Sequence, residues 1–152
     1  MAMKEQVRKR LDVDELDYPE LAHELGPTVV PVLLELVSED DPRIAPRAAY
    51  LASLFDTDEA AEVLAQAAQS RHDATRVAAA ASLSNIASAK VNSQVFIDLL
   101  RDPDPGVRAK SVSAASLRNE TAINVRLNEL MNVDPVKEIR SITAKALNAR
   151  DR

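Results

Sequence analysis

The stretch that decides the fold is DPDPGVRAKSVSAASL, residues 102–117, in which an Asp-Pro turn leads into small and apolar residues around Arg108. An Asp side chain caps the free N–H groups of a helix start, and Pro fits the first helical turn. The alanines that follow favour helix and let a neighbouring helix approach closely. The stretch therefore predicts a helix that begins at this turn and packs tightly against its neighbours.

The same pattern occurs three more times when the chain is aligned on one arginine. The copies are DDPRIAPRAAYLASL (40–54), HDATRVAAAASL (72–83) and VDPVKEIRSITAKAL (133–147). The aligned arginines are 29 to 32 residues apart, and each follows an aspartate by three to six residues. These aspartates and arginines are Asp41, Arg47, Asp73, Arg76, Asp104, Arg108, Asp134 and Arg140, called the ladder residues below. A period near 31 suits two short helices with their turns, and we expect the ladder residues to link successive repeats structurally.

The segments between these copies are amphipathic, with apolar residues three and four positions apart, as in Val95, Phe96, Leu99 and Leu100. The chain of 152 residues holds only two Gly and no Cys, and alanine and leucine are abundant. Tight hairpin turns lack their usual glycine, whereas helix is the favoured local state. The sequence therefore predicts an all-α protein.

The run Asp104-Pro105-Gly106-Val107-Arg108, followed by small residues and a leucine, resembles a HEAT-like repeat, similar to the short bacterial units that include phycobilisome-lyase-type repeats. LGPTVVPVLLELV at 25–37 resembles the opening helix of such a unit. The resemblance implies a right-handed α-solenoid of stacked antiparallel helix pairs, HEAT/armadillo-like. We expect a single domain with N-terminal capping helices in 1–25 and about four repeats, at 26–55, 56–88, 89–118 and 119–152.

Two copies depart from the repeat pattern. The second has Thr75 where Val or Ile is usual, and the first carries Pro46 directly before its arginine. Because Pro removes a helical hydrogen bond, we expect that helix to start at Pro46. The capping helices are expected at about Lys4 to Leu11 and Pro19 to Leu25.

The charge is unevenly distributed along a chain whose formal net charge is −5. Residues 1–70 hold 6 Lys and Arg against 15 Asp and Glu, and residues 71–152 hold 13 against 9. The basic start lacks the apolar region of a secretory signal, and no apolar stretch is long enough to span a bilayer. We expect a cytoplasmic protein without membrane contact, either monomeric or weakly self-associating through its opposite charges.

Catalytic and cofactor motifs are missing from the sequence. Without Cys, thiol chemistry and Cys-ligated metals are excluded, and His23 and His72 have no second ligand within helical reach. The acidic clusters at 39–41 and 56–59 lie at helix starts, where carboxylates favour the helix dipole. We therefore expect no enzyme, no cofactor and no metal site.

A partner protein is expected on the concave face, which the second helix of each repeat lines in a solenoid. The candidate partner-binding residues are Asn85, Lys110, Ser113, Lys145 and Asn148. The same register predicts that Ala49, Ala52, Phe55 and Ser116 also point outward. One alternative, implied by the resemblance, is an accessory subunit of a lyase or chromophore-handling enzyme. The other is nucleic-acid binding through the basic C-terminal half, which the acidic net charge disfavours.

Overall fold

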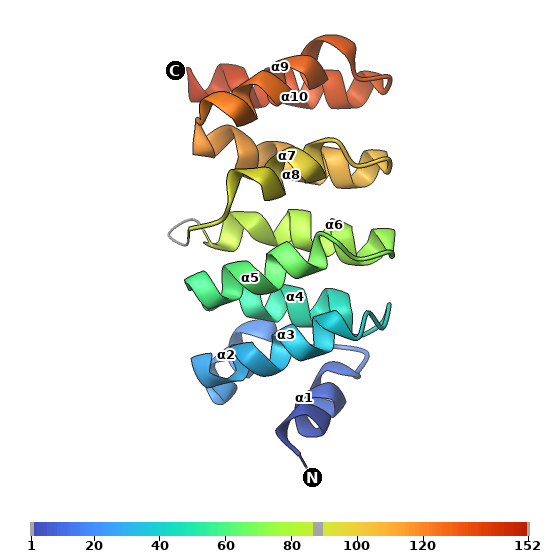
Figure 1. The fold of residues 1–152 in the computed structure, drawn as a ribbon, viewed down its shortest axis with the longest axis vertical. Coiled ribbons are helices and arrows are strands. Elements are labelled where there is room, and N and C mark those ends of the chain that lie inside the picture. Colours follow the sequence, from blue (N-terminus) through green and yellow to red (C-terminus); the bar gives the residue numbers. More distant parts are fainter. Residues whose placement is uncertain (1, 87–89, 152) are drawn as a thin grey trace. The chain divides into compact units, whose positions relative to one another are not determined.

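The computed structural model describes residues 2–86 and 90–151, and these residues form helices and connecting turns without a strand (Figure 1). The helices are α1 (Met3–Leu11), α2 (Tyr18–Leu25), η1 (Pro27–Val29), α3 (Val30–Ser38), α4 (Ala45–Ser53), α5 (Asp58–Ala67), α6 (Asp73–Ser82), η2 (Leu83–Ile86), α7 (Ser93–Leu100), α8 (Pro105–Arg118), α9 (Thr121–Val133) and α10 (Lys137–Arg150). The prediction of an all-α chain is confirmed.

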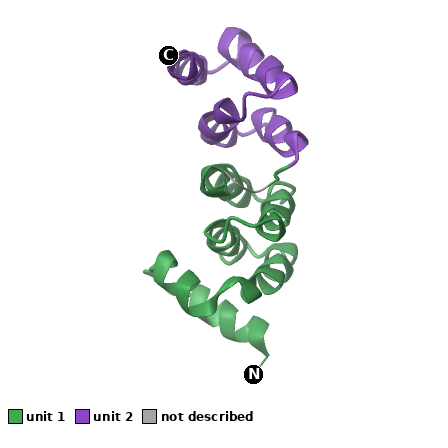
Figure 2. Cartoon of the chain, turned by 90° about the vertical axis from the view of Figure 1, so that its left-hand side faces the viewer, with its two compact units in different colours: residues 1–91 green, residues 92–152 purple. Residues whose placement is uncertain are grey.

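The chain divides into two compact units, unit 1 at residues 1–91 and unit 2 at residues 92–152, which Figure 2 distinguishes by colour. The predicted boundary between the second and third repeats, at 88/89, lies outside the described residues.

Unit 1 is built as two layers of helices. α3 packs beside α5 and α4 beside α6, while α3 also packs on α4, α4 on α5, and α5 on α6 (Figure 2). Large side chains such as Leu33, Leu36, Leu51 and Leu64 fill the space between the layers and are fully buried. The two N-terminal helices were predicted within one residue of their observed ends, and α1 packs on α3.

Unit 2 repeats this arrangement with four helices, α7 beside α9 and α8 beside α10. Arg108 near the start of α8 contacts Asp134 just before α10, and Arg150 at the end of α10 donates to the carbonyl of Ser116 near the end of α8. α8 and α10 therefore run side by side in the same direction.

Short polar side chains start several of these helices, as the sequence pattern indicates. Asp104 Oδ1 accepts the N–H of Gly106 at 2.6 Å ahead of α8, and Thr57 Oγ1 accepts the N–H of Ala60 ahead of α5. α4 begins at Ala45, one residue before the predicted Pro46. These caps supply hydrogen bonds that the first turn of a helix cannot make internally.

Three residues expected to point outward are buried instead. Ala49 and Ala52 in α4 are completely buried, and Ser116 in α8 is 4% exposed. α4 contacts α3, α5, α6 and η2, so helices surround more of its circumference than they do for α10, which contacts α8 and α9. A prediction of exposure that assumes the same register in every repeat therefore fails for a helix with more neighbouring helices.

Candidate interaction surfaces

Three of the four aligned arginines share one local contact. Arg76, Arg108 and Arg140 each donate from Nη1 to the backbone carbonyl six residues earlier. The acceptors are Ser70 at 3.0 Å, Asp102 at 2.9 Å and Asp134 at 2.5 Å. Each bond ties the turn before a helix to the first turn of that helix. Arg47 differs, because its Nη1 donates to the carbonyls of Leu11 and Val13 and so holds the segment that follows α1.

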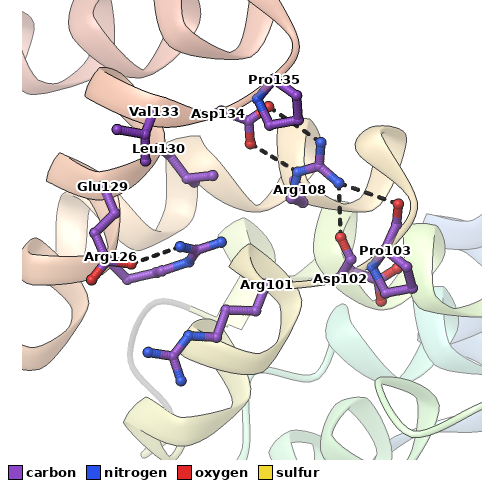
Figure 3. A pocket seen from close by; sticks show the side chains of 10 residues that line it. All are labelled: Arg101, Asp102, Pro103, Arg108, Arg126, Glu129, Leu130, Val133, Asp134 and Pro135. Carbon is purple, nitrogen blue, oxygen red and sulfur yellow. Dashed lines mark hydrogen bonds and ion pairs between the residues drawn. The ribbon is translucent and has the colours of Figure 1, made fainter.

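Arg108 also forms a buried ion pair with Asp134. Its Nε lies 2.9 Å from Asp134 Oδ2 and its Nη2 3.2 Å from Oδ1 (Figure 3). Burial of Asp134 opposes its ionisation, but the bonds from Arg108 and from the N–H of Val136 outweigh that effect and hold the Asp134 pKa below its usual value. This contact joins α8 to the turn that starts α10.

The other ladder aspartates lie at or just before the first turns of helices. Asp41 Oδ1 accepts the N–H groups of Arg43 and Ile44, at 2.8 and 3.3 Å. Asp104 caps α8, and Asp73 is the first residue of α6. These positions explain why an aspartate recurs in each copy of the repeat.

A pocket of about 250 Å³ lies next to the ion pair in unit 2 (Figure 3). Arg126 lines it, with Nη1 2.7 Å from Glu129 Oε2 and Nη2 3.2 Å from the carbonyl of Leu100. Arg101, at its edge, is exposed. Its three arginines face Asp102, Glu129 and Asp134, so the charges of the lining balance. The pocket is consequently no specific site for an anion.

Four of the five predicted partner-binding residues lie on α8 and α10. Lys110 and Ser113 are exposed on α8, and Lys145 and Asn148 are exposed on α10. Asn85 belongs to η2 in unit 1, where its exposed side chain donates to Ser53 Oγ at 3.1 Å. The structure therefore brings the candidates of unit 2 onto adjacent helices.

Two apolar side chains share this surface. Leu117 is 75% exposed on α8, and Ile142 is 38% exposed on α10. We call the surface formed by Lys110, Ser113, Leu117, Ile142 and Lys145 the α8–α10 strip. Sequence reasoning missed Leu117 because it named only Lys110, Ser113 and Ser116 for the outward register of this repeat. Its position nine residues after Arg108 belongs to the outward register, whereas Ala115 fills the closing position and is buried.

A third surface was not predicted. Both tyrosines of the chain, Tyr18 at the start of α2 and Tyr50 in α4, line one open pocket of about 410 Å³ together with Pro46, Arg47 and Ala78. The two rings meet edge to face, with centroids 4.7 Å apart. Burial raises the pKa of Tyr18 above its usual value, against the nearby charge of Arg47. The spacing of the tyrosines, which matches the repeat period, is the signal that sequence reasoning overlooked.

No protein-family model matches this chain, and no curated protein matches it. Among the described residues, no three His, Cys, Asp or Glu side chains are grouped so as to hold a metal ion. In the same part of the chain no single helix is long and apolar enough to cross a membrane; α2 followed by Pro27–Ser38 meets the length and composition criteria only as a pair bent by 90°.

Proposed function

We propose that this chain is a non-enzymatic protein-interaction module, a right-handed HEAT-like solenoid of antiparallel helix pairs that acts in the cytoplasm. The repeated bond from Arg76, Arg108 and Arg140 to the carbonyl six residues earlier supports the repeat, because one sequence register gives one contact three times. Helical repeats bury their apolar faces between neighbours and leave an extended surface free for partners.

The observation that carries the proposal is the exposure of Leu117 on the α8–α10 strip. Single exposed leucines are ordinary, but Ile142 lies on the same strip and lysines at 110 and 145 accompany them. Exposed apolar side chains accompanied by charged ones are common in protein interfaces. The strip is suited to a helix that presents small apolar residues and acidic side chains.

The exposed residues of α9 supply a control surface outside the strip. Asn128 and Asn132 are exposed on this helix, and their side chains donate to the carbonyls of Asn124 and Asn128, both at 2.9 Å. Val125 is 56% exposed on the same helix. A partner that requires the α8–α10 strip should therefore bind equally well when Val125 is substituted.

The experiment compares the proteins recovered from a lysate of the source organism by wild type, Leu117→Asp and Val125→Asp. We expect one protein to bind wild type and Val125→Asp equally and Leu117→Asp at least about tenfold less, because a charge replaces an exposed apolar side chain of the strip. Equal recovery by all three proteins would contradict the proposal.

The same preparations distinguish the other functions. A nucleic-acid ligand would be lost steeply as salt is raised from about 50 to 200 mM, because phosphate contacts release counterions. A bound chromophore would give the purified protein a visible absorption band. We expect neither.

A further inference from the structure

The tyrosine pocket of unit 1, formed by Tyr18, Pro46, Arg47, Tyr50 and Ala78, has the features of a binding site. Its volume of about 410 Å³ falls within the range of roughly 300–1,000 Å³ typical of ligand sites. Neither tyrosine hydroxyl has a hydrogen-bond partner among the described residues. Two aromatic rings with unused hydroxyl groups present both apolar surface and hydrogen-bonding capacity at the same place.

The pocket is held in place by contacts outside it. The edge-to-face packing of Tyr18 and Tyr50 fixes both rings, and Arg47 is tied through Nη1 to the carbonyls of Leu11 and Val13. Pro46 and Ala78 have little side-chain freedom to lose. Binding at such a site costs little ordering entropy.

The surroundings of the pocket are acidic. The segment between α1 and α2 connects Val13, whose carbonyl accepts a hydrogen bond from Arg47, to Tyr18. Because Arg47 and Tyr18 both line the pocket, this segment lies next to it. Asp14 and Glu15 in this segment are exposed, and Asp14 Oδ1 lies 3.7 Å from Arg43 Nη2. Unit 1 as a whole holds 9 Lys and Arg against 16 Asp and Glu. A basic ligand group is therefore favoured beside the pocket, whereas Arg47 disfavours one between the rings.

We propose that the tyrosine pocket binds an extended, proline-containing segment of a partner protein that carries a basic residue next to its prolines. A polyproline II segment makes no internal hydrogen bonds, so its carbonyls are free to accept from the tyrosine hydroxyls. Its prolines pack against aromatic side chains, as in other aromatic-lined grooves. The basic residue lies against Asp14 and Glu15.

This site goes beyond the function proposed for the α8–α10 strip, because it lies in unit 1 and its test involves no residue of the strip. The probes are two synthetic peptides, one arginine followed by eight prolines and the same arginine followed by eight alternating glycines and serines. The chain has two Tyr and no Trp, so its intrinsic emission reports on this pocket alone. Calorimetry gives the affinities.

We expect the proline peptide to change the tyrosine emission and to bind at least about tenfold more tightly than the glycine-serine peptide. Tyr50→Leu should weaken binding at least about tenfold, and Asp14→Asn with Glu15→Gln should weaken it less and reduce its salt dependence. Val125→Asp, a control at an exposed position of unit 2 outside the strip, should bind as wild type does.

Tyr18→Phe keeps both rings and removes one hydroxyl, so it tests the pocket even if Tyr50→Leu does not fold. We expect it to bind the proline peptide more weakly than wild type while keeping the same thermal midpoint within a few degrees. No binding of the proline peptide by wild type at millimolar concentration, equal binding of the two peptides, or unchanged binding by a folded Tyr50→Leu would overturn the proposal.

Discussion

The guanidinium of Arg108 and the carboxylate of Asp134 meet through two hydrogen bonds, although 26 positions separate the two residues in the chain. Both residues are less than one tenth exposed. A buried ion pair gains little net stability over an apolar pair, but its geometry can fix the register of packed elements. Here it sets the first turn of α8 against the turn that begins α10.

Removal of Arg108 should be far more costly than removal of Arg140. Arg108→Ala leaves Asp134 buried without its partner, which costs about 3–5 kcal/mol of unfolding free energy. Arg140→Ala removes a bond to the Asp134 carbonyl, worth about 1 kcal/mol. Urea denaturation followed by circular dichroism measures both variants. Equal losses of stability would show that the ion pair does not have this role.

Thr75→Val should stabilise the protein. Thr75 is completely buried in α6, and its Oγ1 has no hydrogen-bond partner among the described residues. Valine has nearly the same shape and removes an unsatisfied hydroxyl, so we expect a gain of about 1 kcal/mol.

The matched control for this change is Thr143→Val in α10. Thr143 is equally buried, but its Oγ1 donates to the carbonyl of Ile139 at 2.6 Å. Removal of that bond should cost about 0.5–1.5 kcal/mol. Thermal or urea unfolding of the two variants should therefore give shifts of opposite sign, and shifts of the same sign would contradict this explanation.

Stability should fall in acid as Asp134 is protonated. Its pKa is lower in the folded protein than in the unfolded chain, so its contribution is complete above the unfolded value and is lost as the pH falls through the folded one. In Arg108→Met the carboxylate stays buried without its donor and its pKa rises. Asp134 should therefore contribute a smaller loss of stability in acid in this variant than in wild type, as urea midpoints between about pH 2 and 7 would report.

Gly26→Ala should destabilise the junction between α2 and η1. Gly26 has φ 71° and ψ 172°, a conformation open almost only to glycine, although no heavy atom lies within 4 Å of an added Cβ. The cost, about 1–3 kcal/mol, arises from backbone strain alone. A thermal midpoint equal to that of wild type would show that this turn relaxes freely.

The sequence was informative about helices because their signals are local. Asp104 and Thr57 cap the helices that follow them, and the end of α1 at Leu11 and that of α2 at Leu25 match the predictions. The burial of a side chain, by contrast, depends on which other helices pack around it. Ala49 and Ala52 occupy the predicted outward register, yet neighbouring helices cover them because α4 is enclosed on several sides.

The candidate site was predictable only in part for the same reason. Lys110 and Lys145 are exposed as expected, since a charged residue in the outward register has little reason to be buried. The meeting of Tyr18 with Tyr50 depends on how the segment after α1 folds back onto α4. That path is set by hydrogen bonds from Arg47 to backbone carbonyls, which the spacing of the two tyrosines does not by itself reveal.

The most direct test of the central claim is photo-crosslinking from defined positions of the repeat. A benzophenone amino acid is placed at Ser113 on the α8–α10 strip or at Asn128 on α9, both exposed, and the protein is irradiated in lysate. The proposed function predicts one discrete crosslinked protein from position 113 and none from position 128. Crosslinking of the same protein from both positions with equal yield, or from position 128 alone, would contradict it.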